Sequence, residues 1–282
     1  MTEKNLSNEN VDLAGRKSDK ISVLKSVGVG LCALALTAFG AWAQPVQETA
    51  KTGTTAQTNA IATKDTVMTW GDPSDPDSKV KNGKPVAKGW VSLFDGKTLK
   101  GWNYEKGYWE VLDGAIHGDK KHDTPNHHYM FTDKDYKDFE CHIDVKMVGY
   151  NSGVCARINP KNFDDVPGYQ VDMGDGYWGC LWDEHHRQVK IFDFPKAEAD
   201  KILHKDDWNH YYFKMNGPHI VIYLNGVKTA EGDDPGGFAS GPLGFQLCHG
   251  ANTVADFRHI YVKLLSPALP GTAPKSIDNP VP

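Results

Sequence analysis

Residues 139–147 alternate between apolar and polar side chains without interruption. Successive side chains of a β-strand point to opposite faces, so this segment predicts a strand with one buried face and one polar face. The segments 151–157 and 168–172 continue the pattern, and we interpret residues 139–158 as a hairpin that turns at Tyr150. The polar face of this sheet is expected to collect His142, Asp144, Arg157, Gln170 and Asp172.

Further short segments of the same kind follow one another from residue 90 to residue 264. Several end at Asp-Gly or Asn-Gly, the pairs that tight hairpin turns prefer because both central residues need a positive φ. No stretch predicts a long amphipathic helix, although residues 196–203 could form one short turn. The pattern therefore predicts an all-β fold, an antiparallel two-sheet jelly-roll sandwich over about residues 88–265. Its interior should hold Phe139, Ile143, Val145, Tyr169, Val171, Phe245 and Leu247.

The first 43 residues read as an export signal. Basic residues precede an apolar run at 27–43, and the run closes with Ala41-Trp42-Ala43, the small-x-small pattern that a signal peptidase cleaves. We expect cleavage after Ala43, a periplasmic or secreted mature protein, and membrane contact only through this segment before cleavage. N-terminal sequencing should then begin at Gln44, whereas a chain that keeps Met1 in the inner membrane would support the alternative of an uncleaved anchor.

Composition limits the remaining segments. Residues 44–87 are expected to be a Thr/Ala-rich disordered tether, and residues 266–282 a Pro-rich extended tail. The net charge of −5 comes without a basic block in the mature part, so we do not expect nucleic acid as a partner. Four cysteines follow the signal segment, with no C-x-x-C pair, and buried free thiols are the expected state. These cysteines are Cys141, Cys155, Cys180 and Cys248.

Several chemistry-bearing side chains gather near the central strands. Asp183, Glu184 and Arg187 form a dense charged segment directly after the tryptophans Trp178 and Trp182, whose rings suit stacking on a sugar. The alternative for each residue is structural: a charged loop, a core tryptophan, or an arginine that only pairs with a buried carboxylate. The histidines His117, His122, His127 and His128 lack a ligand spacing and are expected to lie in a surface loop.

An ordered series of motifs makes the chain similar to a known family. Residues 92–102, the Trp-x-Val-x-Asp-Gly element at 109–114 and the Asn-Ser-Gly-x-x-x-Arg element at 151–157 come first. Trp208-Asn209, Asn225-Gly226 and the closing segments 244–250 and 257–260 follow. Over about residues 88–265 the series resembles the 3-keto-disaccharide hydrolase domain family. The resemblance implies a concanavalin A-like sandwich that acts on carbohydrates oxidised at C3.

Such chemistry has definite requirements. A ketone at C3 acidifies the C2 proton, and loss of that proton lets the C1 substituent leave before water adds. The site then needs a base, a group that stabilises the enolate oxygen, and an acid for the leaving group. One divalent metal ion bridging O2 and O3 could stabilise the enolate, although the sequence does not identify its ligands.

The chain departs from common family members at one strand. Many have Tyr-Glu-Val-Gln where this chain has Tyr169-Gln170-Val171-Asp172. Gln170 cannot act as a nucleophile, and the Glu-x-Asp-x-(x)-Glu strand of laminarinase-like glucanases is absent, which disfavours ordinary retaining glycosidase chemistry.

The resemblance and the shared strand faces together assign roles. The expected catalytic residues are Asp172, His249, Arg157 and Glu184. The expected substrate-binding residues are Gln170, Trp178, Trp182, Asp183, Arg187, Gln246 and His142. Two alternatives remain: a non-catalytic, lectin-like glycan-binding module of the cell envelope, and a structural domain of a larger assembly.

Overall fold

The computed structural model describes residues 66–120, 124–250, 252–267 and 269–271. Contacts divide the chain into residues 1–58 and residues 59–282, and every described residue lies in the second unit. The predicted signal segment, residues 44–65 of the predicted tether, and His122 lie outside the described residues.

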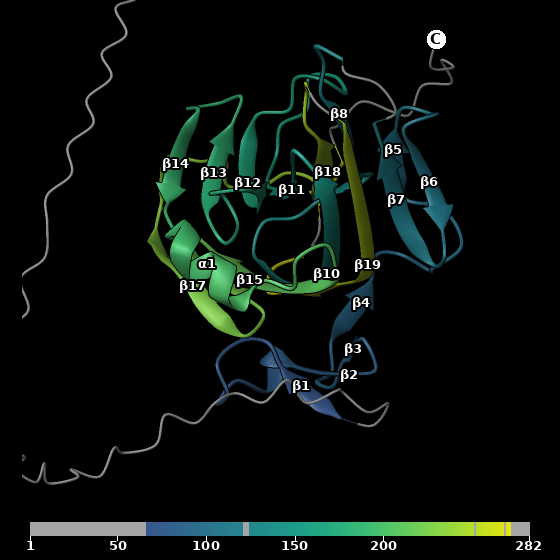
Figure 1. Cartoon of the computed structure of the whole chain (residues 1–282). Coiled ribbons are helices and arrows are strands. Elements are labelled where there is room, and N and C mark those ends of the chain that lie inside the picture. The colour runs from purple at the N-terminus through teal and green to yellow at the C-terminus, as the bar shows by residue number, and fades with distance from the viewer. Residues whose placement is uncertain (1–65, 121–123, 251, 268, 272–282) are drawn as a thin grey trace, which may run out of the picture. The chain divides into compact units, whose positions relative to one another are not determined.

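Two antiparallel sheets form the domain, as the alternation predicts (Figure 1). The eight-stranded sheet has the order β17 (Val227–Asp233), β16 (His219–Leu224), β15 (Asn209–Asn216), β10 (Phe139–Gly149), β19 (Thr253–Leu264), β7 (Ala115–Asp119), β6 (Trp109–Leu112), with β4 (Trp90–Ser92) pairing with β19. The seven-stranded sheet has the order β14 (Val189–Phe192), β13 (Leu181–Glu184), β12 (Gly168–Gly174), β11 (Asn151–Ala156), β18 (Gly244–Leu247), β8 (His128–Thr132), β5 (Trp102–Tyr104). The all-β, antiparallel two-sheet sandwich is confirmed.

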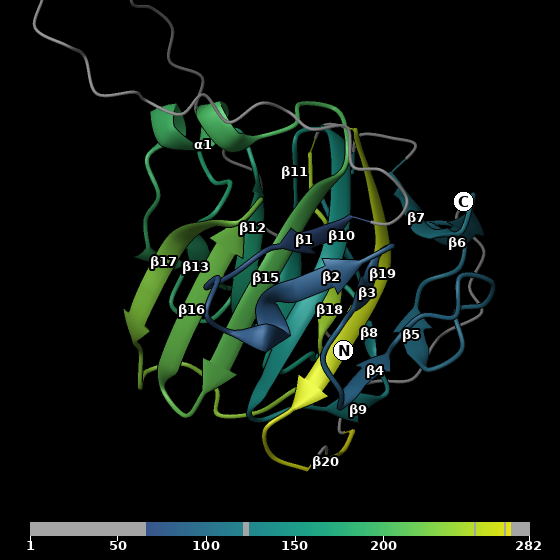
Figure 2. The same ribbon diagram turned by 90° about the horizontal axis from the view of Figure 1, so that it is seen from below.

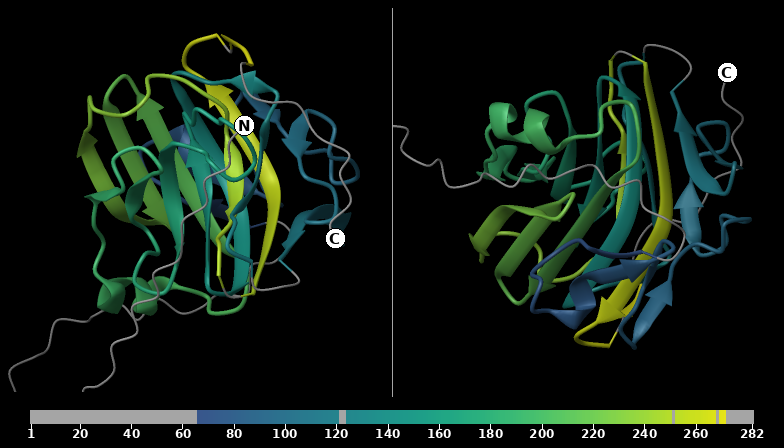
Figure 3. Two further views of the ribbon diagram at one scale, coloured as in Figure 1. Left: turned by 90° about the horizontal axis from the view of Figure 1, so that it is seen from above. Right: turned by 60° about the horizontal axis from the view of Figure 1, so that its bottom comes forward.

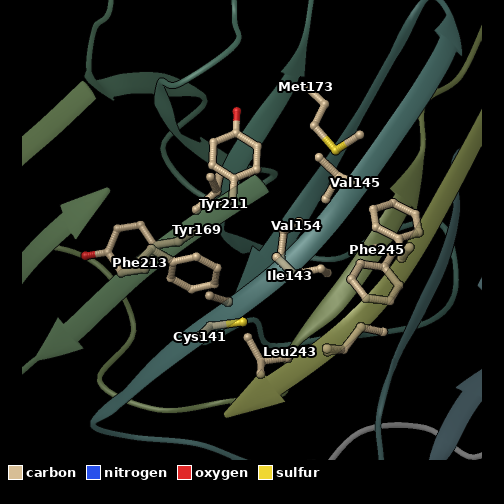
Figure 4. Close-up of a cluster of buried hydrophobic side chains, with 14 of the residues drawn as sticks. Cys141, Ile143, Val145, Val154, Tyr169, Met173, Tyr211, Phe213, Leu243 and Phe245 are labelled. Atoms are coloured by element: carbon tan, nitrogen blue, oxygen red, sulfur yellow. The ribbon is translucent and has the colours of Figure 1, made fainter. Parts of the chain in front are cut away.

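The hydrophobic core fills the space between the sheets. Every second residue of β10 points inward and meets the inward residues of β12 and β18 (Figure 4). All seven predicted core residues are at most 1% exposed: Phe139, Ile143, Val145, Tyr169, Val171, Phe245 and Leu247. A shift of one residue in β10 would turn its inward side chains to the outer face, so this burial fixes the register of the strand.

The predicted hairpin at 139–158 is wrong. β10 pairs with β15 and β19, whereas β11 pairs with β12 and β18, so the chain passes from one sheet to the other at residues 149–151. Gly149 allows the crossing because its φ is +112° and a Cβ there would overlap with the carbonyl of Asn252. As a result His142 and Asp144 lie on the outer face of the eight-stranded sheet, and Gln170 and Asp172 on the outer face of the other.

Part of the predicted tether is folded. Strands β1 (Val67–Thr69), β2 (Lys79–Lys81) and β3 (Lys84–Pro85), with a short 3-10 helix η1 (Pro76–Ser78), form a small sheet across the eight-stranded sheet (Figure 2). We call residues 67–85 the N-terminal cover. Trp70 stacks on His210 with ring centroids 4.7 Å apart, and His142 Nε2 lies 2.7 Å from the carbonyl oxygen of Asp77. The aromatic and imidazole rings on this face explain why a polar segment is ordered there.

The remaining elements are small. Helix α1 (Lys196–Ile202) matches the predicted short turn and lies at one end of the strands (Figure 3). Strand β20 (Leu269–Pro270) pairs with β9 (Lys134–Asp135), so the beginning of the predicted extended tail is also held by the fold. No helix in the described part of the chain is long and apolar enough to span a bilayer. All four cysteines of the domain are free and buried, as predicted.

Candidate functional site

A pocket of about 250 Å³ opens on the outer face of the seven-stranded sheet. It lies over β12, β13 and β18 and over the turns at their ends. Its lining residues are Tyr150, Asn151, Gln170, Asp172, Asp175, Tyr177, Trp182, Glu184, Gln246, Cys248 and His249. Six of the eleven predicted site residues therefore meet here: Asp172, His249, Glu184, Gln170, Trp182 and Gln246.

Strand register brings the floor of the pocket together. On β11, Gly153 lies opposite both Asp172 of β12 and Gln246 of β18. A Cβ at Gly153 would overlap with the side chain of Gln170, so only glycine lets that amide lie flat across the strand. The glycine of the Asn-Ser-Gly element is thus explained by the close approach of a pocket side chain.

Asp172 is the most deeply placed carboxylate of the pocket. Its side chain is buried, and its Oδ1 accepts hydrogen bonds from Asn151 Nδ2 at 2.9 Å and from the Met173 amide at 2.8 Å. Burial raises the pKa of Asp172 to about 7, the nearby Glu184 adds to the rise, and the Asn151 hydrogen bond opposes it. A carboxyl group with this pKa exchanges a proton near neutral pH, as a general base must.

An amide network connects Asp172's neighbours across the floor. Gln170 Nε2 donates to Gln246 Oε1 at 3.0 Å, and Gln246 Nε2 donates to the hydroxyl of the buried Tyr129 at 2.6 Å. Gln246 Nε2 also lies 3.5 Å from Glu184 Oε1. Burial raises the pKa of Glu184, while the adjacent His185 and His249 oppose that rise. The floor therefore presents fixed amides beside two carboxyl groups.

Histidines border one side of the pocket. His249 is exposed on the loop after β18, and its Nδ1 lies 3.0 Å from His127 Nε2. His127 is buried, contrary to the prediction of a surface loop, and burial lowers its pKa to about 3, helped by His185 and His249. The buried Lys120 donates to the carbonyl oxygens of Cys248 and Gly250, which holds the backbone on both sides of His249.

Two overlapping groups of described residues could hold a metal ion. One consists of His127, Cys248 and His249, and the other of His127, Glu184 and His185. In each group the candidate ligand atoms lie within 4.8 Å of one another. Nitrogen, carboxylate and thiol donors of this kind suit Zn²⁺ and the late transition metals.

Arg157 lies elsewhere, although it was predicted at the pocket. Strand β11 ends at Ala156, and the φ of Arg157 is +48°, so the strand alternation no longer sets its direction. Its buried guanidinium donates to the carbonyl oxygens of Lys137 at 2.6 Å and Gly217 at 2.7 Å, and to Asp138 Oδ1 at 3.1 Å. The geometry corresponds to the structural alternative, an arginine that pairs with a carboxylate and ties loops together.

Asp183 and Arg187 also lie outside the pocket lining. Asp183 is fully buried and accepts from Arg187, which in turn binds Asp234. Next to it on β13, Trp182 and Glu184 point the other way, toward the pocket, because neighbouring strand residues alternate. The predicted charged segment is therefore divided between a pocket wall and a loop anchor.

Trp178 and His142 are also misplaced by the prediction. Trp178 packs against the core and stacks on Tyr211, with centroids 6.2 Å apart. His142 belongs to the eight-stranded sheet, where its Nδ1 lies 2.8 Å from His210 Nε2 beneath the N-terminal cover. The sequence analysis missed His127, Asn151, Tyr150 and Tyr177; the Asn-Ser-Gly element could have pointed to Asn151.

The domain is a jelly-roll sandwich, and one pocket on its outer face combines carboxylates, amides, imidazoles and aromatic rings. This combination is typical of the carbohydrate-active β-sandwich proteins. Within that class, residues 89–263 match the 3-keto-alpha-glucoside-1,2-lyase-like domain. The chain belongs to this family, as its motif series predicts.

Individual relatives are distant. A 3-keto-disaccharide hydrolase of Bacteroides thetaiotaomicron is 25% identical over 177 residues, which cover 52% of this chain and 57% of that protein. The chain thus spans little more than half the length of this curated relative. Among solved structures, a candidate glycosyl hydrolase of Parabacteroides distasonis is 26% identical with a TM-score of 0.47, covering 62% of this chain and 99% of the other. The carbohydrate-binding module CBM66 of Bacillus subtilis is 16% identical with a TM-score of 0.45, covering 58% and 95%.

Proposed function

We propose that this protein is an exported enzyme that cleaves 3-keto-glycosides by abstracting the C2 proton and eliminating the C1 substituent, with water adding afterwards. The observation that carries the proposal is Asp172, a buried carboxyl group on the pocket floor with a pKa raised to about 7. Family membership supports the substrate class, since the family is named for 3-keto-alpha-glucoside-1,2-lyase-like domains.

The reaction balances with the groups in the pocket. Asp172, in its carboxylate form, takes the C2 proton, and the electron pair of the C–H bond moves toward C3 to give an enolate. When the enolate collapses, the C1–O bond breaks and the departing oxygen receives a proton. His249 is the histidine that lines the pocket, and it can supply that proton. Water then adds across C1 and C2, which gives net hydrolysis.

The amides fix the substrate. Gln170 and Gln246 are buried and joined to each other, so their positions are set before a sugar arrives. They can offer polar atoms to the sugar hydroxyls without reorganising. Asn151 keeps Asp172 in one orientation by donating a hydrogen bond to its Oδ1.

A divalent ion fits the histidine border. Of the two groups, His127 with Glu184 and His185 would hold it, because the other group uses His249, the proposed proton donor. The ion would supply positive charge for the enolate oxygen. The lowered pKa of His127 keeps its imidazole neutral, the form that binds metals. Titration with Co²⁺, followed by visible absorption and calorimetry, should show one site in the parent and weaker binding in His127→Ala.

The lectin-like alternative keeps a specific observation in its favour. The pocket is open and exposes aromatic rings at its mouth, which a glycan-binding module would also need. Binding alone would not require Asp172 to exchange protons near neutral pH.

The deciding assay compares a 3-keto-glucoside with the unoxidised glucoside. We expect the parent protein to cleave only the keto form, because only a C3 ketone acidifies the C2 proton. His249→Ala should slow turnover by about two orders of magnitude, the lower range for loss of a proton-transfer group, while calorimetry shows substrate still bound. If the parent binds the keto sugar and never cleaves it, the lectin-like alternative holds.

A further inference from the structure

The exposed aromatic side chains of the described residues gather at the pocket. Among the described residues, only two of the Phe, Trp and Tyr side chains are exposed rather than buried or half-buried: Tyr150 at 55% and Tyr177 at 40%. Both line the mouth of the same pocket. Exposed rings gathered at a cavity mouth are typical of ligand binding, because a soluble protein gains nothing by leaving them in water.

Each of the two tyrosines lies close in sequence to the proposed base or to its hydrogen-bond partner, Asn151. Tyr150 lies at the crossing between the two sheets and directly precedes Asn151, whose amide binds Asp172. Tyr177 lies in the turn that follows β12, where its amide donates to the Gly174 carbonyl oxygen at 3.0 Å. Both rings are therefore attached close in sequence to the proposed base or to its hydrogen-bond partner.

The orientation of Tyr177 is held although its ring is exposed. It meets Trp182 edge to face, with centroids 6.2 Å apart and an interplanar angle of 84°. Lys190 Nζ lies 5.0 Å from the centroid of its ring. A ring held on two sides loses little conformational freedom when a ligand stacks on it.

We infer that Tyr150 and Tyr177 form the leaving-group subsite, which binds the ring attached to C1 of the oxidised sugar. This inference rests on the proposed function. The C2 proton must approach Asp172 on the floor, so the keto sugar fills the polar part of the pocket and its C1 substituent points to the mouth. There the apolar faces of Tyr150 and Tyr177 suit a six-membered ring with an apolar face, either a second pyranose or an aryl group.

The test uses three 3-keto-glucosides that differ only at C1: a methyl glycoside, a disaccharide and an aryl glucoside. Tyr177→Ala and Tyr150→Ala should each lower kcat/KM on the disaccharide or the aryl glucoside by about tenfold, the effect of one lost aromatic contact. The loss on the methyl glycoside, which has no second ring to stack, should be the smallest of the three. Tyr177→Phe keeps the ring and should restore the parent value. Tyr223→Ala, on β16 of the other sheet, is the matched control.

The result also separates the two possible leaving groups. A loss confined to the disaccharide identifies a sugar subsite, and a loss confined to the aryl glucoside identifies an aglycone subsite; either supports the inference. Equal losses on all three substrates, or no loss on any, would overturn it while the proposed function stands. If the parent cleaves none of them, the proposed function fails. Calorimetry then decides the subsite: binding of the disaccharide that is tighter than that of the methyl glycoside, and weakened by Tyr177→Ala, would keep it, and equal binding would reject it.

Discussion

Asp172→Asn is expected to reduce turnover of a 3-keto-glucoside by two to four orders of magnitude, about the value of a general base. Asparagine has the same shape and can still accept the hydrogen bonds of Asn151 and Met173 at its Oδ1. The fold and the binding of substrate should therefore persist, and the loss should appear in kcat rather than in KM. Turnover at the parental rate would exclude Asp172 as the base.

The same substitution should stabilise the protein at neutral and alkaline pH. The pKa of Asp172 is raised from 3.8 to about 7, so between these values the folded state holds a proton that the unfolded state has lost. The free energy of unfolding of the parent then falls as pH rises through this range. Asparagine removes that fall, and its advantage should grow from pH 4 to pH 7 and stay constant above, with an upper limit of about 4 kcal/mol.

Thermal unfolding from pH 4 to pH 9 measures this difference. Asp133→Asn, a change at an exposed carboxylate outside the pocket, is the control and should follow the parent at every pH. If Asp172→Asn changes the stability by the same amount at pH 4 and at pH 8, then folding does not raise the pKa of Asp172.

Gly153→Ala is expected to damage both stability and activity. The backbone of Gly153 is ordinary extended strand, so the added methyl acts only by overlapping with Gln170. Overpacking of a buried strand typically costs about 1–3 kcal/mol. Displacing Gln170 also breaks its hydrogen bond to Gln246, and substrate affinity should fall with it.

A double-mutant cycle tests the steric cause. Gln170→Ala removes the side chain that the new methyl would meet, so Gly153→Ala should cost almost nothing in that background. Chemical denaturation of the four proteins gives the coupling energy. If Gly153→Ala is equally destabilising with and without Gln170, then close approach of this amide does not explain the glycine.

The sequence predicted strand faces well and sheet membership poorly. Alternation identifies which residues of one strand share a side, and the core residues Phe139, Ile143 and Val145 are buried as expected. It contains no information about which of two sheets a strand joins. His142 and Gln170 both point away from the core, as alternation predicts. Because the chain crosses between the sheets at Gly149, they nevertheless lie on the outer faces of different sheets.

The site residues that lie on regular strands could be predicted from the sequence. Gln170, Asp172 and Glu184 follow from alternation along β12 and β13, and they meet at one pocket. Arg157 follows a strand end with a left-handed backbone, and His127 precedes β8 in an irregular segment. Side-chain direction in such segments depends on tertiary contacts, which a local pattern cannot supply.

The position of the N-terminal cover determines on which side of the domain a support or fusion partner can be attached. It rests on the eight-stranded sheet, whereas the pocket opens on the outer face of the seven-stranded sheet. A support or fusion partner joined directly ahead of Val67 would therefore sit behind the molecule and leave the mouth at Tyr150 and Tyr177 free for long or branched glycans. Attachment after Pro270 gives no such separation, because β20 pairs with β9, which follows β8 of the pocket's own sheet.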